Sequence, residues 1–80
     1  MDDKEIMQHI ERLVNEEHHL LQLAEEGKLE GDQHARMREL EVNLDRCWDL
    51  LRQRRARRNA GLNPDEARER DGQTVEHYLQ

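Results

Sequence analysis

The sequence predicts an all-α protein: an antiparallel two-helix hairpin (coiled-coil-like) followed by a short C-terminal helical segment. Two long stretches carry apolar residues at alternating steps of three and four, the spacing of one face of an amphipathic helix. The connection between them, from Gly27 to Gly31, is short. Because a short connection between long helices makes them adjacent and antiparallel, the two apolar faces are expected to meet.

The first helix is expected over about residues 3–26. Asp2 and Asp3 precede its first apolar residue, where carboxylates cap free amides and complement the helix dipole. Gly27 is expected to stop it, because glycine adopts a left-handed conformation without a side-chain penalty. The inner apolar row is Ile6, Ile10, Leu13, Leu20 and Ala24, and the flanking row is Met7, Val14 and Leu21.

Glu17 occupies the one polar position of the inner row, between Leu13 and Leu20. A single polar residue at such a position often sets the register and the number of partners. We therefore predict that Glu17 is register-setting, with Arg36 or Arg38 of the same or a neighbouring chain as its ion-pair partner.

The second helix is expected over about residues 32–59, with Leu29 packing onto its start and Gly61 beyond its end. Its inner row is Met37, Leu40, Leu44, Cys47 and Leu51, with Trp48 and Leu50 on the flank. Folding the hairpin about Leu29 brings the two inner rows together in register, pairing Ile6 with Leu51, Ile10 with Cys47, Leu13 with Leu44, and Leu20 with Met37.

The hairpin is expected to occupy residues 1–60 and a tail with short helical turns residues 61–80. Asn63, Pro64 and Glu66 form a helix-start signal, with a capping residue, proline at the first helical position and glutamate three residues after the cap. The last turns need a surface on which Tyr78 and Leu79 dock, since isolated turns are unstable.

The composition predicts a small core that needs a partner. The chain has 80 residues, 34% apolar and 40% charged, with no Phe. A domain of this size buries a modest share of its surface, and the flanking residues of a two-helix rod stay exposed. We therefore expect a homodimer that pairs into a four-helix bundle, or a protein partner. The residues expected at a second interface, either with another protomer or with the tail, are Met7, Val14, Leu21, Trp48 and Leu50.

The sequence shows no recognisable targeting signal, which favours a cytoplasmic location. The opening MDDKEIM has neither the basic start nor the apolar run of a signal peptide. No apolar stretch approaches the roughly 20 residues of a membrane helix. We expect a cytoplasmic protein that does not contact membranes.

The strongest charge feature is an arginine cluster, which gives residues 51–60 a charge of +5 in a chain of net charge −6. One interpretation is a patch that contacts nucleic acid or an acidic protein. The favoured one is internal charge complementation by Asp2, Asp3, Glu5 and the acidic tail 65–71, at a helix end where cations are stabilised. The cluster comprises Arg52, Arg54, Arg55, Arg57 and Arg58.

Two further features carry alternative chemistry. Glu16 and His19 are three residues apart, the spacing by which one helix supplies two ligands to a di-iron site in a helical bundle. The apolar repeat, however, places Glu17 and not this pair in the inner row. Cys47 on the inner seam is typical of a small core residue rather than a nucleophile. No catalytic set or phosphate-binding loop occurs, so we expect no enzymatic activity and no cofactor.

The runs LEVNLDRCWDLLRQRRARR at 40–58 and LVNEEHHLL at 13–21, with the ending YLQ at 78–80, resemble a family of short actinobacterial proteins named domain of unknown function 2630. The resemblance covers essentially the whole chain and implies a bacterial, cytoplasmic, helical protein. It carries over no activity, cofactor or catalytic residue. Members often open the second helix with Ser-Pro, where this chain has Glu30 and Gly31, so a less rigid loop is expected here.

Together these features predict a non-enzymatic protein-protein interaction or regulatory module. Its predicted interaction residues are Trp48, Arg52, Arg54, Arg55, Arg58, Met7, Val14 and Leu21. The alternatives are a nucleic-acid-associated protein that uses the arginine-rich helix end, and a metal-binding bundle that uses Glu16 and His19.

Overall fold

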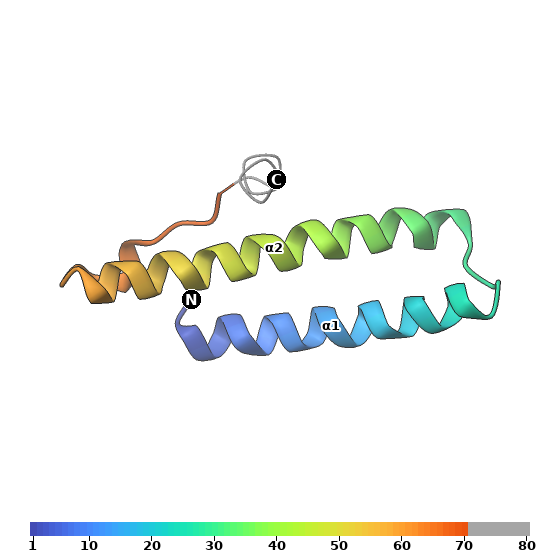
Figure 1. Ribbon diagram of the computed structural model, residues 1–80, viewed down its shortest axis with the longest axis horizontal. Coiled ribbons are helices and arrows are strands. Elements are labelled where there is room, and N and C mark those ends of the chain that lie inside the picture. Colours follow the sequence, from blue (N-terminus) through green and yellow to red (C-terminus); the bar gives the residue numbers. More distant parts are fainter. Residues whose placement is uncertain (71–80) are drawn as a thin grey trace.

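The computed structural model describes residues 1–70. Two α-helices, α1 (Asp3–Glu25) and α2 (Gly31–Asn59), lie side by side and antiparallel, and a single 3-10 turn, η1 (Pro64–Glu66), follows them (Figure 1). The described part of the chain contains no strand. The predicted all-α hairpin is therefore confirmed, while the expected docking of Tyr78 and Leu79 concerns residues outside the described range.

A reciprocal capping box opens α1. The Asp2 carboxylate accepts a hydrogen bond from the Glu5 backbone N–H at 2.8 Å, and the Asp2 N–H donates to the Glu5 carboxylate at 3.2 Å. These bonds satisfy backbone donors that have no partner within the helix. Asp3, the first residue of α1, lies in the acidic first turn and directs its carboxylate toward α2, as the charge-complementation interpretation predicts.

Glycine ends both helices. Gly27 has φ +69° and Gly61 has φ +74°, a left-handed conformation that a side chain would strain. Beyond Gly27, the Lys28 N–H donates to the Leu23 carbonyl at 2.8 Å, which satisfies one of the free carbonyls at the helix end. The end of α1 at Glu25 lies one residue before the expected position.

The core lies along the contact between the helices, and its buried apolar residues are Ile6, Ile10, Leu13, Leu20, Leu40, Leu44, Cys47 and Leu50. Leu50, expected on the outer flank, is only 7% exposed, whereas Leu51 is half-buried. The chain after α2 folds back onto this side of the helix, where Ala67 packs against the core cluster, so Leu50 lies on the tail side, one of the two interfaces expected for it.

Two expected inner positions of α1 are not fully buried. Ala24 is exposed, because the first turn of α2 that follows the connection offers it no large apolar side chain. Glu17 is half-buried and makes no ion pair or side-chain hydrogen bond among the described residues. The apolar row of α1 is therefore shorter than its sequence repeat suggests.

The segment after α2 forms less helix than its start signal predicts. Asn63 caps η1 by accepting from the Asp65 N–H at 3.0 Å, but the helix ends after one turn. Side chains of α2 then hold the extended backbone: Gln53 donates to the Arg68 carbonyl at 2.9 Å, and Arg46 donates to the Arg70 carbonyl at 2.9 Å. Carbonyls engaged in this way no longer require a helical partner.

The described helices can also be compared with the dimensions of a lipid bilayer. Neither helix within residues 1–70 combines the length and apolar character needed to cross one.

Candidate interaction groove

The arginine cluster divides into paired and unpaired side chains. Arg54 is only 5% exposed and connects three parts of the chain. Its Nε donates to Asp3 Oδ1 of α1 at 2.5 Å, and its Nη1 donates to Asp65 Oδ1 at 3.0 Å and to the Pro64 carbonyl at 3.2 Å. This guanidinium is thus enclosed by the fold, and its bonds are made within the chain.

Two further arginines are also paired within the chain. Arg57 donates to the Asn63 carbonyl at 2.7 Å and to the Glu66 carboxylate at 2.8 Å. Arg58 pairs with Asp3 Oδ2 at 2.7 Å. These contacts follow the charge-complementation interpretation, although the acidic partner on α1 is Asp3 alone, since the side chains of Asp2 and Glu5 form the capping box.

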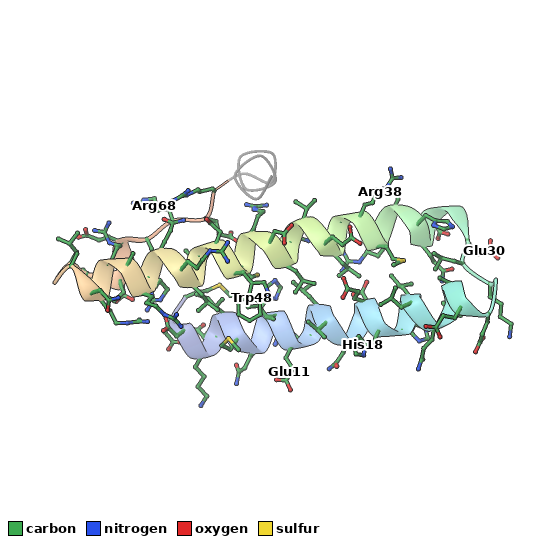
Figure 2. The ribbon with its side chains drawn as sticks, viewed as in Figure 1. Glu11, His18, Glu30, Arg38, Trp48 and Arg68 are labelled. Atoms are coloured by element: carbon green, nitrogen blue, oxygen red, sulfur yellow. The ribbon has the colours of Figure 1, made fainter. Side chains whose placement is uncertain are left out.

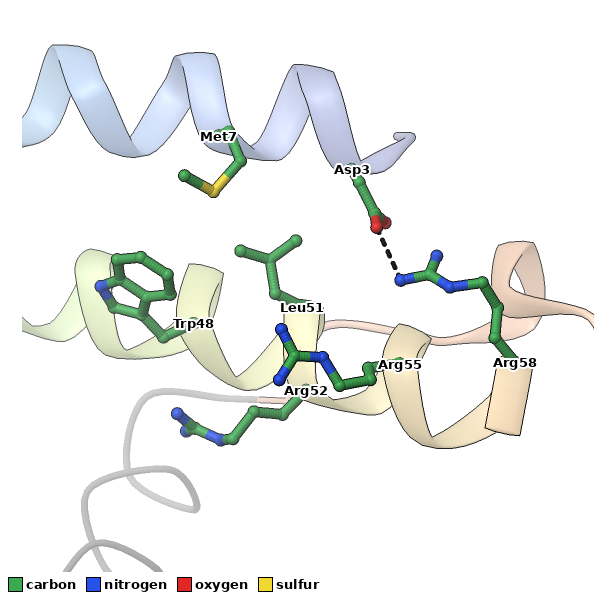
Figure 3. A pocket seen from close by; sticks show the side chains of 7 residues that line it. All are labelled: Asp3, Met7, Trp48, Leu51, Arg52, Arg55 and Arg58. Atoms are coloured by element: carbon green, nitrogen blue, oxygen red, sulfur yellow. Dashed lines mark ion pairs between the residues drawn. The ribbon is translucent and has the colours of Figure 1, made fainter. Parts of the chain in front are cut away.

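Arg52 and Arg55 differ from these three neighbours. Both are exposed, and neither makes an ion pair or side-chain hydrogen bond with any part of the described chain. They border a groove of about 490 Å³ between the start of α1 and the second half of α2. This Trp48 groove is lined by Asp3, Met7, Trp48, Leu51, Arg52, Arg55 and Arg58 (Figure 3).

The apolar part of the Trp48 groove comes from both helices. Met7 projects from α1 toward Trp48 and Leu51 of α2 (Figure 3). Trp48 is 42% exposed and Met7 is 46% exposed, so both present apolar surface to solvent. The structure thus brings together Met7, Trp48, Arg52, Arg55 and Arg58 among the predicted interaction residues.

Besides the buried Arg54, two predicted interaction residues lie outside the groove, farther along α1. Leu21 is 41% exposed, and Val14 is half-buried against the core. Neither lines the Trp48 groove. Together with Met7 they form a separate row on the outer flank of α1.

Arg36 pairs with Glu16 rather than with Glu17. Its Nε and Nη2 donate to the two Glu16 carboxylate oxygens at 2.5 and 3.0 Å, and its Nη1 donates to Glu39 at 2.9 Å. Within the chain Arg36 therefore does not pair with Glu17, because Glu16 lies on the side of α1 that Arg36 reaches. Pairing of Glu17 with Arg38 or with a neighbouring chain, and its register-setting role, stay predictions. The carboxylate considered for a metal site is occupied by a guanidinium, and residues 1–70 hold no group of three potential metal ligands.

Cys47 is buried and free. Burial raises the pKa of its thiol above the usual range, and the nearby Glu69 carboxylate acts in the same direction. A raised pKa lowers the thiolate fraction at neutral pH, and the thiolate is the reactive form. These properties are typical of a core thiol.

One buried polar contact on α2, made by Asp49, was not predicted from the sequence. Asp49 is only 6% exposed, and its carboxylate accepts from Gln53 at 2.8 Å and lies 3.5 Å from Arg70 Nε. The four-residue spacing of Asp49 and Gln53 indicates that their side chains can contact each other on α2. No residue near Asp49 in the sequence indicates that the chain after α2 covers this carboxylate.

Acid should destabilise the hairpin through Asp3 and Glu16. Hydrogen bonds from Arg58 and then Arg54 lower the pKa of Asp3 below its ordinary 3.8, and a hydrogen bond from Arg36 lowers the pKa of Glu16 below its ordinary 4.5. Because both folded-state pKa values are depressed, this stabilisation is complete above the ordinary values. It is lost as the pH falls through them toward the folded-state values.

Thermal unfolding followed by circular dichroism between about pH 6 and pH 2.5 tests this prediction. Asp3→Asn and Glu16→Gln are expected to lower Tm at pH 6 and to flatten its decline in acid. A decline as steep in the double variant as in the native chain would contradict the assignment. Glu41→Gln, an exposed substitution of the same type, is the control.

Comparison with known proteins identifies relatives over nearly the whole chain. Uncharacterised proteins of Mycobacterium bovis and Mycobacterium tuberculosis are 47% identical over 77 residues, which cover 95% of this chain and 88% of each relative. No solved structure matches the chain. The profile of a family described as protein of unknown function (DUF2630) matches residues 2–80, and the chain belongs to this family.

Proposed function

We propose that the protein is a non-enzymatic, cytoplasmic interaction module with a regulatory role, and that its Trp48 groove binds an acidic amphipathic segment of another protein. One observation carries the proposal: Arg52 and Arg55 border exposed apolar surface without an acidic partner among residues 1–70, while Arg54, Arg57 and Arg58 are ion-paired. Unpaired cations beside exposed apolar side chains favour a partner that supplies both carboxylates and an apolar anchor.

The residue types of the groove suit protein recognition. Tryptophan, methionine and arginine are enriched at the centres of protein interfaces. Met7, Trp48 and Leu51 offer apolar surface for one anchor side chain, and a guanidinium binds a carboxylate through two parallel hydrogen bonds. The groove is lined by apolar side chains, guanidinium groups and the ion-paired Asp3 carboxylate, which suits contact and charge pairing with a partner.

A protein partner is favoured over nucleic acid by the charge around the groove. Three of the five clustered arginines are neutralised within the chain. The remaining two lie beside Asp3 in a protein of net charge −6. Affinity for nucleic acid depends chiefly on the number of phosphates neutralised by Lys and Arg, and this surface offers few such contacts.

Photocrosslinking in mycobacterial cells tests the proposal. A benzophenone amino acid replaces Ala56, which is exposed one turn beyond Arg52, and crosslinked products are identified by mass spectrometry after nuclease treatment. We expect a protein product that falls about tenfold, as for the loss of an interface hot spot, in the variant Trp48→Ala, Arg52→Gln, Arg55→Gln.

The matched control combines Arg38→Gln with Leu62→Ala, two exposed positions outside the groove. This control is expected to retain the product. Equal yields from the groove variant and the control would rule out binding at the groove. Loss of the product on nuclease treatment would favour the nucleic-acid alternative.

A further inference from the structure

The outer flank of α1 carries a row of apolar residues separate from the core. Met7, Val14 and Leu21 are seven residues apart, so they lie along one side of the helix. A seven-residue apolar repeat is the spacing by which one helix packs along another in a left-handed pair. Met7 and Leu21 are 46% and 41% exposed, so this α1 row has no complete cover among the described residues.

A second row with the same spacing runs beside it. Lys4, Glu11, His18 and Glu25 are also seven residues apart, and all four are exposed. Figure 2 shows Glu11 and His18 projecting from the side of α1 that faces away from α2. None of the four makes an ion pair or side-chain hydrogen bond with any residue of the described range.

We propose that a second copy of this chain docks on the α1 row, with the two α1 helices antiparallel and Val14 facing Val14 on the twofold axis. At about 1.5 Å per residue, Met7 and Leu21 lie about 10 Å from Val14 on opposite sides. The twofold axis therefore brings Met7 of one copy to Leu21 of the other. The apolar row continues across the interface without a gap.

The row of Lys4, Glu11, His18 and Glu25 favours the antiparallel direction over the parallel one. Lys4 lies about 15 Å from Val14 toward one end and Glu25 about 16 Å toward the other, at about 1.5 Å per residue, so the antiparallel arrangement brings them together. It also brings Glu11 to His18. In a parallel arrangement the twofold axis runs along the helices, so the charged rows of the two copies lie on opposite sides of the apolar contact. Lys4 then does not reach Glu25 of the second copy, and Glu11 does not reach His18, so the complementary pairs are lost.

The surface of α1 also has a matching depression. A hollow of about 300 Å³ is lined by His18, Leu21, Gln22 and Glu25. In the antiparallel arrangement the exposed Met7 side chain of the second copy lies over this hollow. Each copy contributes one Met7 and one hollow, as the self-complementary interface of a twofold dimer requires.

This dimer is independent of the proposed function. The contact uses the outer flank of α1 and leaves Arg52 and Arg55 of α2 outside it. Met7 is the one residue common to the α1 row and the Trp48 groove. If the dimer forms and the groove binds nothing, only the proposed function fails. If the chain stays monomeric and still gives the Ala56 crosslink, only the dimer fails.

Charge exchange tests the dimer. Sedimentation velocity over a dilution series gives the dimer Kd of the native chain, Lys4→Glu, Glu25→Lys and the double variant. Each single change makes two symmetric pairs repulsive and is expected to weaken the dimer about tenfold or more. The double variant restores opposite charges across the interface and is expected to return within about threefold of the native Kd.

Arg38→Glu and Glu41→Lys make the same charge changes at exposed positions of α2 and are expected to leave the Kd unchanged. Circular dichroism of each variant checks that it folds. A native chain that stays monomeric up to about 0.5 mM overturns the proposal. So do single variants as tight as the native dimer, or a double variant that is not rescued.

Disulfide mapping tests the direction separately. Under mild oxidation Val14→Cys is expected to form a covalent dimer, and Met7→Cys is expected to link to Leu21→Cys in a mixture but not to itself. Efficient linkage of Met7→Cys to itself, or failure of Val14→Cys to link, overturns the antiparallel geometry. The native chain is the control, because its Cys47 is only 4% exposed.

Discussion

Leu40→Ala is expected to lower the free energy of unfolding by about 3 kcal/mol, near the middle of the range for leaving a cavity in place of a leucine side chain. Leu40 is fully buried in the core cluster. The total stability of a chain of 80 residues is about 4 to 12 kcal/mol. Loss of this one side chain therefore removes a large share of the stability of the hairpin.

Urea unfolding followed by circular dichroism at one fixed protein concentration measures this change, since dimerisation makes stability concentration-dependent. Leu62→Ala is the matched control, because Leu62 is 54% exposed beyond the end of α2. Its expected effect is below about 0.5 kcal/mol. Similar losses at the two positions would contradict the assignment of the core.

Arg54→Met is expected to cost about 2 kcal/mol. Removing one partner of a buried ion pair costs about 3 to 5 kcal/mol, and the value is reduced here because the Asp3 and Asp65 carboxylates keep contact with water. Methionine retains most of the apolar stem. It cannot replace the bonds to Asp3, Asp65 and the Pro64 carbonyl. The loss should therefore loosen residues 61–70 from α2 before the hairpin itself unfolds.

Hydrogen exchange read by mass spectrometry, together with urea unfolding, tests this expectation. Arg55→Met is the control, since Arg55 is the next residue on α2 but exposed and unpaired among residues 1–70. Its expected stability change is within about 0.5 kcal/mol. If both variants change stability and exchange alike, the internal role assigned to Arg54 is wrong.

The groove could be predicted only in part from the sequence. The repeat indicated that Met7, Trp48 and the arginine-rich end of α2 lie on outer surfaces near the start of α1. It did not distinguish Arg54 from Arg55, because the two are identical residues adjacent on one helix and differ only in the direction in which their side chains point. Asp3, which engages Arg54, lies 51 residues away in the chain.

The helices and their antiparallel pairing follow from the sequence alone. Their limits depend on local chemistry, such as the bonds between Asp2 and Glu5 and the left-handed glycines Gly27 and Gly61. The short connection between them then allows only adjacent, antiparallel packing. These features involve residues close together in the chain, so their physical causes are visible without the fold.

Which neighbour on each helix is covered depends instead on tertiary packing. Leu50 is buried where Leu51 is only half-buried, and Glu16 rather than Glu17 pairs with Arg36. Neighbouring helical residues point about 100° apart, so a small rotation or a returning segment exchanges their environments. The chain after α2 supplies that segment, and its contacts with α2 join residues that no local pattern in the sequence connects.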